Sequence, residues 1–167
     1  MDLRVPLPDR VAGPVETPLS YTTDVGGPCL RLERTGPLSI PHATWTNLIF
    51  DLVQSSVNWP FTPPSSVLTL PATGFYLVGG GFVSAQTAAA TVRVIVALWS
   101  SAASPQPFIA AQETQVAASG IAVPAVTTGY YAVGGTTIQL QAYQDSGAAL
   151  ALQVDGWRAT FWATRVA

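Results

Sequence analysis

From residue 40 to its end, the sequence is a succession of short runs of β-branched and aromatic residues, and each run ends in glycine, proline or a small polar turn. In 136–144 (TTIQLQAYQ), Gln139 and Gln141 alternate with apolar residues, which is the period of a strand buried on one face. No window carries the apolar stripe of a helix, and the flanking glycine and threonine argue against a helix in the alanine-rich stretch 85–90. Short strands at this spacing predict an all-β, antiparallel β-sandwich of the jelly-roll type. The expected strands are 44–52, 67–70, 74–84, 91–99, 108–116, 121–123, 129–133, 136–144, 149–154 and 157–166.

The first 37 residues have a different character, because prolines occur throughout them and exclude a helix. We therefore divide the chain into an extended, proline-rich arm (1–37) and a jelly-roll domain (38–167). Isolated apolar residues recur along the arm, and each could occupy a small depression on a partner: Leu3, Val5, Leu7, Val11, Val15, Leu19 and Tyr21. The alternative interpretation of the arm is a disordered linker.

Charge is distributed unevenly between these two parts. The chain has seven basic residues, all arginine, and nine acidic ones, and more than half of them lie within the first 36 positions. A soluble domain of this size normally covers itself with charge. A body with so little charge is expected to hide surface against other protein, which indicates a component of an assembly. The net charge of −2 comes with no basic patch, so a nucleic-acid partner is not expected.

The residues that usually carry catalysis or bind metals are scarce. His42 is the only histidine, and its neighbours provide no acid for a nucleophile–base pair, so we interpret it as a structural residue. Cys29 is alone, which excludes an internal disulfide, and no cluster of zinc ligands is present. Asp145 and Asp155 lie in predicted turns, where aspartate commonly bonds its own backbone. We predict no enzymatic activity, no metal and no cofactor.

No apolar stretch approaches the roughly eighteen residues of a membrane-spanning helix, and the N-terminus lacks the apolar core of a signal peptide. The sequence therefore predicts a protein made in the cytoplasm, with no membrane partner.

Four segments together resemble the C1q/TNF-like trimeric jelly rolls, in particular those of bacteriophage virion proteins. They are 42–51 (HATWTNLIFD), 70–84 (LPATGFYLVGGGFVS), 137–152 (TIQLQAYQDSGAALAL) and 158–166 (RATFWATRV). The family usually has Gly-Asp before the third segment, where this chain has Gly134-Gly135. The resemblance implies a homotrimer of jelly rolls around an axis. It also implies that Tyr76, Tyr143 and Trp162 lie near this axis; the alternative for each is an ordinary core aromatic.

We accordingly expect a structural protein of a bacteriophage virion: a homotrimeric capsid decoration protein that stabilises the head. It would sit on the capsid exterior, attached through its arms to the major capsid protein or another virion protein. The alternative is a receptor-binding or fibre-tip module that recognises a host surface glycan by stacking on Trp59 or Trp99, unless these residues belong to the core. A cellular C1q-like adhesion module is a third possibility.

Overall fold

The computed structural model describes residues 27–87, 91–102 and 108–167. Within these residues the chain forms strands and no helix, so the described part holds no helix long and apolar enough to cross a membrane. The strands are β1 (Cys29–Glu33), β2 (Ser39–Ile40), β3 (Thr46–Asn47), β4 (Leu52–Val57), β5 (Leu68–Thr69), β6 (Gly74–Gly81), β7 (Thr91–Ser100), β8 (Phe108–Ala117), β9 (Ala125–Ala132), β10 (Thr137–Gln144), β11 (Leu150–Ala151) and β12 (Thr160–Arg165). This confirms the all-β prediction.

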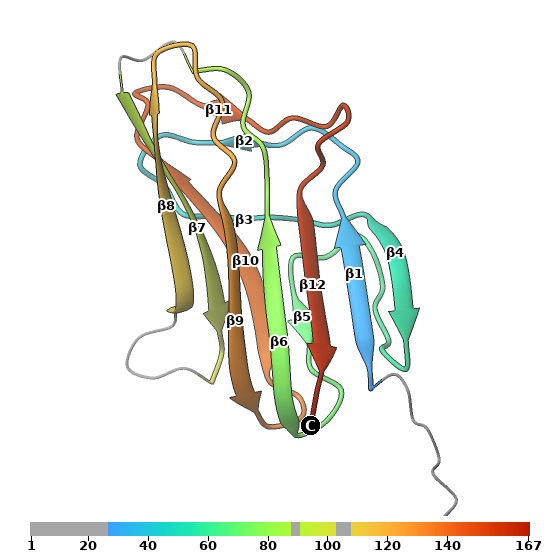
Figure 1. The fold of residues 1–167 in the computed structure, drawn as a ribbon. Coiled ribbons are helices and arrows are strands. Elements are labelled where there is room, and N and C mark those ends of the chain that lie inside the picture. The colour runs from blue at the N-terminus through green and yellow to red at the C-terminus, as the bar shows by residue number, and fades with distance from the viewer. Residues whose placement is uncertain (1–26, 88–90, 103–107) are drawn as a thin grey trace, which may run out of the picture.

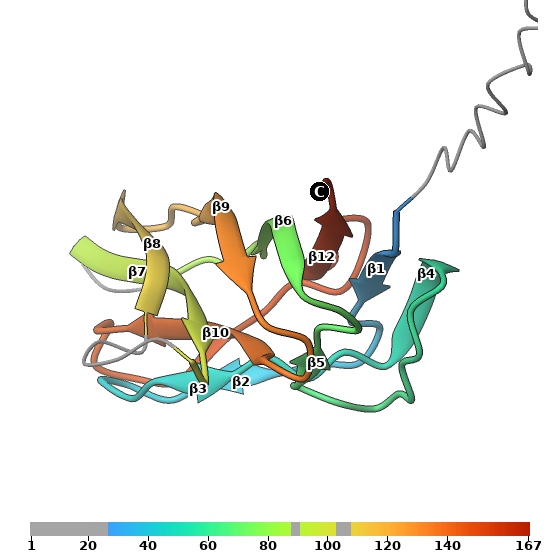
Figure 2. The ribbon, with the colours of Figure 1, turned by 90° about the horizontal axis from the view of Figure 1, so that it is seen from below.

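The strands make two facing sheets, which Figures 1 and 2 show from two directions. The first sheet has the order β4–β1–β12–β6–β9, and the second has the order β3–β10–β7–β8, with β5 also paired to β10. All of these pairings are antiparallel, and β2 and β11 form a small separate pair at one end of the sandwich. From β5 onward the chain repeatedly crosses between the two sheets, as a jelly roll does.

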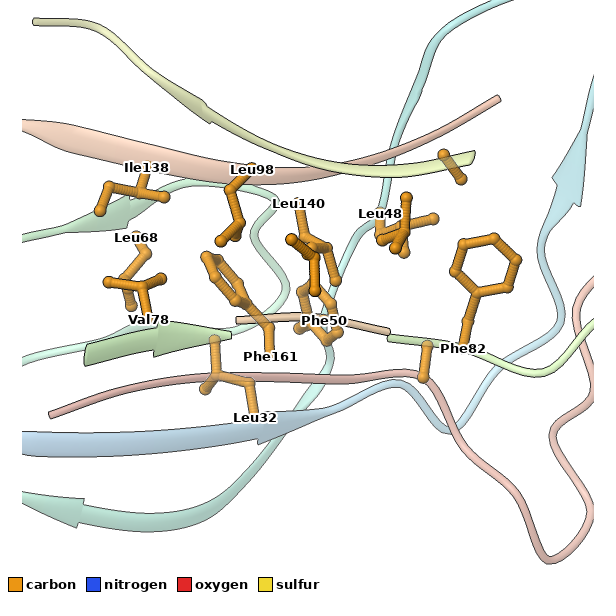
Figure 3. Close-up of a cluster of buried hydrophobic side chains, with 14 of the residues drawn as sticks. Leu32, Leu48, Phe50, Leu68, Val78, Phe82, Leu98, Ile138, Leu140 and Phe161 are labelled. Carbon is orange, nitrogen blue, oxygen red and sulfur yellow. The ribbon is translucent and has the colours of Figure 1, made fainter. Parts of the chain in front are cut away.

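The core fills the space between the sheets (Figure 3). In β10 the buried and part-buried positions alternate strictly, as its sequence predicts, and Ile138, Leu140 and Ala142 point inward. Phe161 from β12 packs against Phe50 with ring centroids 5.5 Å apart. One apolar layer, supplied by both sheets, therefore holds the sandwich together.

The sequence analysis missed β1, which lies inside the segment assigned to the arm. Leu30 and Leu32 are buried, and the strand is hydrogen-bonded to β12 on one side and to β4 on the other. Arg31 and Glu33 point outward between them, so the charge-rich sequence concealed a strand in the middle of the sheet. The folded domain therefore includes residues 29–37, which the predicted boundary left outside it.

Two other strand predictions need correction. The expected strand 44–52 is broken into β3, an isolated bridge at Phe50, and the start of β4. The expected strand 121–123 is irregular, and the next strand, β9, begins at Ala125. β4 itself was only partly anticipated, because it is a sheet edge whose side chains are mostly exposed and need no apolar alternation.

A carboxylate holds the connection after β1 in place. Asp51 accepts hydrogen bonds from the backbone N–H groups of Thr35 (2.6 Å) and Gly36 (3.1 Å), while Arg34 donates to the carbonyl of Ile49 (2.8 Å). Partial burial alone raises the pKa of Asp51, but the hydrogen bonds from Thr35 and Gly36, with the charge of Arg34, outweigh it and lower the pKa below its ordinary value.

Both ends of the described domain lie at the same end of the sandwich. The backbone N–H of Arg165 donates to the carbonyl of Pro28 (2.9 Å), and Ala167 continues the pairing of β12 with β6 by accepting a hydrogen bond from Phe75. Figure 1 shows this end opposite the β2–β11 pair. The preceding segment of the chain, residues 1–26, thus joins the domain beside its C-terminus.

Candidate functional site

The outer face of the first sheet is apolar where β6, β9 and β12 lie side by side. In β6, Tyr76 and Val78 point into the core, so Phe75 and Leu77 point out. Phe75 lies opposite Tyr131 of β9 in the strand register. We call this surface the apolar face and define it by Val57, Phe75, Leu77, Tyr131, Trp162 and Val166.

Two rings on the apolar face lie over glycines. A Cβ on Gly79 would come within 2.5 Å of the Trp162 ring, and a Cβ on Gly129 would come within 2.5 Å of the Phe75 ring. Only glycine leaves room for a ring to lie this close to the neighbouring strand. The rings are thereby held flat against the sheet, which makes the face broad and firm.

The outer face of the first sheet has a projecting side chain at its β9 edge and a hollow toward its opposite edge. Tyr131, on the edge strand β9, is 66% exposed and stands out from the sheet. Across the same sheet, a hollow of about 410 Å³ lies between β1 and β12. Its lining is Cys29, Leu30, Arg31, Ser55, Thr160, Trp162 and Thr164.

Charge is nearly absent from the three strands that carry the apolar face. Arg165 is the only charged residue within β6, β9 and β12, and it lies at the last position of β12. The charged groups that border these strands are Arg31, which lies opposite Trp162 in the pairing of β1 with β12, and Glu33, which is paired with Arg158 (3.4 Å) and more loosely with Arg31 (3.9 Å). An apolar surface bordered by charges is a typical protein-interaction surface.

The structure separates the three aromatic residues expected near a trimer axis. Trp162 lies on the apolar face, and its place near a trimer axis stays a prediction. Tyr76 needs correction: its side chain is fully buried, its hydroxyl donates to the carbonyl of Ala72 (2.6 Å), and it has no surface to offer to another subunit. Tyr143 belongs to β10 in the second sheet, on the other side of the sandwich.

The two tryptophans proposed for sugar stacking also differ. Trp59 is buried beside Tyr76, with ring centroids 5.8 Å apart, and its Nε1 donates to the carbonyl of Thr69 (2.9 Å). Trp59 is therefore a core residue and is withdrawn as a sugar-binding candidate. Trp99 is part-buried on the outer face of β7, opposite Gln139 of β10.

The proposed contact residues of the arm lie outside the described residues. They are Leu3, Val5, Leu7, Val11, Val15, Leu19 and Tyr21, and their role remains a prediction.

The sequence analysis overlooked Phe75, Leu77 and Tyr131. A signal was present in β6, where GFYLV places apolar residues at consecutive positions, so both faces of the strand are apolar. In an antiparallel sandwich only one face of a strand meets the core. The second apolar face of β6 indicates a further surface to be covered.

The described residues bring together no metal-binding group of three or more histidine, cysteine, aspartate and glutamate side chains. The Nδ1 atom of His42 accepts a hydrogen bond from the backbone N–H of Gly147 (3.0 Å), which ties two turns together. Asp145 was expected to bond its own turn, but it accepts a hydrogen bond from the backbone N–H of Arg93 (2.7 Å) and pairs with the Arg93 side chain.

Comparison with solved structures places the fold among C1q and TNF-type jelly rolls. The globular domain of zebrafish complement 1qA superposes with a TM-score of 0.56 at 14% identity, covering 84% of this chain and 98% of that one. Murine APRIL superposes with a TM-score of 0.62 at 11% identity, covering 84% and 99%. Eiger TNF from S. frugiperda gives 0.56 at 9% identity, covering 85% and 94%.

No protein-family model matches the sequence, and no curated protein matches it. At these identities the likeness concerns the fold alone. The predicted C1q/TNF-like jelly roll is confirmed.

Proposed function

We propose that this protein is a homotrimeric structural module whose subunits associate through the apolar face, and which attaches to a larger protein shell through residues 1–26. The apolar face carries the proposal: it is broad, nearly free of charge, and left open by a single subunit. Three copies is the number implied by the resemblance to C1q/TNF-like jelly rolls, and the solved structures support that fold.

The shape of the apolar face fits a ring of subunits. Its projection at Tyr131 and its hollow beside Trp162 both lie on the outer face of the first sheet. The projection is at the β9 edge, and the hollow is toward the opposite edge. A contact between two different patches of identical subunits is heterologous, and it closes into a ring when the rotation between subunits divides a full turn. We propose that the β9 edge of one subunit packs against the β1–β12 hollow of the next. Such closure covers the exposed residues of the apolar face and leaves none of that face for open-ended growth.

The position of the N-terminal segment suits attachment. In a ring with cyclic symmetry, the three copies of Gly27 lie at the same height along the axis, so three segments start from one end of the trimer. Weak contacts by each segment reinforce one another, because binding of the first raises the effective concentration of the other two. Attachment then outlasts any single contact.

The shell we propose is a bacteriophage capsid, decorated on its exterior by this trimer, with the major capsid protein or another virion protein as partner. The support is the resemblance to virion jelly rolls, together with a charged, proline-rich segment joined to a charge-poor domain. The protein would act by cross-linking neighbouring capsid subunits and would carry out no catalysis. Nothing in this role needs a cofactor.

Sedimentation of the full-length protein tests the assembly. We expect a trimer at micromolar concentration, and we expect Leu77→Lys to sediment as a monomer, because it puts an unpaired charge in the centre of the apolar face. Ile49→Lys is the matched control, since Ile49 is as exposed as Leu77 (41%) and follows Leu48, whose backbone N–H is bonded to Leu140 of the second sheet. A monomeric wild-type protein, or a trimeric Leu77→Lys, would refute the assembly.

A truncation tests the attachment. The structure shows where to cut: removing residues 1–26 spares β1, whereas removing residues 1–36 would delete a central strand of the first sheet. We expect the shorter truncation to remain trimeric and to lose binding to purified capsids. Capsid binding by the truncated trimer would contradict the role given to residues 1–26 and leave the trimer itself unaffected.

A further inference from the structure

The outer face of the second sheet carries a compact group of aromatic rings. Trp45, just before β3, contacts Phe108 at the start of β8 with ring centroids 4.8 Å apart, and Tyr143 of β10 at 5.3 Å. Trp45 is 40% exposed and Phe108 is 37% exposed. We call these three residues the aromatic platform. They come from three different strands or strand ends, and none of them belongs to the core cluster.

The aromatic platform is supported from below and from the side. Ala97 shares the outward side of β7 with Ile95 and Trp99 by alternation, yet it is fully buried, so other side chains of this outer face cover it. The Arg93 guanidinium lies 5.5 Å from the centroid of the Tyr143 ring, a cation–π distance. A surface held in this way is organised before any ligand arrives, which lowers the entropic cost of binding.

Charge at this site is compensated internally. Arg93 forms an ion pair with Asp145 at 3.2 Å, and the backbone N–H of Arg93 donates to the same carboxylate. The hydrogen bond with Tyr143, followed by the charge of Asp145, raises the pKa of Arg93 above its ordinary value. The pair carries no net charge, and the exposed carboxylate of Glu113 on β8, which also acts on Arg93, adds a negative charge that disfavours an anionic ligand.

Amide side chains border the rings. Gln141 donates from its Nε2 to the Oδ1 of Asn47 at 2.8 Å. Gln141 lies two residues from Tyr143 along β10, and Asn47 lies two residues from Trp45. Gln139 follows two residues along the same face of β10, opposite Trp99. Each amide has two donor hydrogens and an acceptor oxygen, so this single bond leaves further capacity for hydroxyl groups.

We propose that the aromatic platform and its bordering amides bind a neutral saccharide. The C–H face of a sugar ring packs on exposed aromatic rings, and its hydroxyl groups exchange hydrogen bonds with amides that both donate and accept. Binding sites for small molecules are typically lined by aromatic side chains and by a few polar groups that fix the orientation of the ligand. Three part-exposed rings fall short of the roughly 800 Å² per partner that a stable protein interface covers.

This site goes beyond the proposed assembly, because it lies on the opposite side of the sandwich from the apolar face (Figure 2). In the proposed trimer, the second sheet of each subunit remains outward, so three equivalent saccharide sites would face the surroundings. The two proposals fail independently: the monomeric Leu77→Lys variant should retain saccharide binding.

Saturation-transfer NMR on the full-length protein tests the site, with a panel of neutral trisaccharides (cello-, malto-, manno- and chitotriose) at millimolar concentration. We expect binding of at least one, weakened about tenfold or more by Trp45→Ala, which corresponds to about 1.4 kcal/mol. Gln141→Met is the second variant: it keeps the volume of the side chain, removes the amide, and should also weaken binding. Trp157→Ala is the matched control, because Trp157 is 68% exposed in the loop between β11 and β12.

The site is refuted if no trisaccharide of the panel binds the wild-type protein. It is equally refuted if Trp157→Ala weakens binding as much as Trp45→Ala does, or if sialylated or sulfated trisaccharides bind more tightly than their neutral counterparts. Binding that survives both Trp45→Ala and Gln141→Met would also overturn it.

Discussion

The two outer faces of this sandwich enclose the same core but differ in chemistry. On the first sheet, Phe75 and Trp162 lie over glycines, and strands β6, β9 and β12 carry almost no charge. On the second sheet, aromatic rings stand beside amides, and the charged groups Arg93 and Asp145 pair with each other. The inner faces must be apolar because they form the core. The residues of the outer faces are free to differ, so they indicate what each face contacts.

This difference localises the low charge of the chain. From sequence, the whole body looked as if it were hidden against other protein. In the structure the low charge belongs to the outer face of the first sheet, while the outer face of the second sheet carries aromatic rings, amides and an ion pair. A global average of charge could not indicate which surface carries so little charge.

The largest contrast between the faces should appear in the reactivity of Cys29. This is the only cysteine of the chain, and it lines the hollow in the apolar face. If that face is covered, a thiol reagent must wait for the interface to open, and each 1.4 kcal/mol of opening free energy slows labelling about tenfold. We expect labelling of the wild-type protein to be about a hundredfold slower than labelling of the Leu77→Lys variant. Equal rates in the two proteins would show that the hollow is open in both.

Gly79 should be intolerant of a side chain because of what lies on the apolar face. A Cβ at this position would meet the Trp162 ring at 2.5 Å and the hydroxyl of Thr127 at 2.7 Å. We expect Gly79→Ala to lower the free energy of unfolding by about 2 kcal/mol, measured by chemical denaturation at a fixed protein concentration. The matched control is Gly36→Ala, where the nearest atom is at an ordinary contact distance of 3.5 Å and the change should stay within about 0.5 kcal/mol. Similar losses at both positions would remove the special role of the ring.

The smallest expected effect concerns Asp51, a charge that serves neither face. Its lowered pKa means that the folded state favours the ionised carboxylate, so its contribution is present above the ordinary pKa of 3.8 and is lost as the pH falls through the lowered value. We expect Asp51→Asn to cost about 1 kcal/mol at pH 7 and progressively less below pH 4. Thermal unfolding of both proteins across this pH range measures the difference. A gap that widens on acidification would contradict the assigned direction.

Much of the fold was predictable because one-sided burial leaves a two-residue period in the sequence. β10 follows that period throughout, and β6 and β7 follow it over their first residues. All three were expected near their observed positions. β1 and β4 were missed or displaced for opposite reasons. β1 carries charge on its outward side, and β4 is an exposed edge that has little apolar pattern to read.

The site was predicted only in part, since a one-dimensional pattern does not say which side of a strand meets the core. Phe75 and Tyr76 are adjacent aromatic residues of β6. The sequence analysis selected Tyr76 for the interface, but Tyr76 is buried and Phe75 is exposed. Trp162 lies on the outer face of the first sheet, and its place near a trimer axis stays a prediction. The aromatic platform joins residues nearly a hundred positions apart, Trp45 and Tyr143, and only the strand pairing brings them together.

The bond between Arg165 and Pro28 has a practical consequence for engineering. Cargo fused after Ala167 would emerge beside the start of β1 and crowd the very segment that we assign to anchoring. The loop around Gly156 lies at the far end of the molecule, and a side chain there would meet nothing within 4 Å. Peptides displayed from that loop would point away from the anchored side, three per trimer.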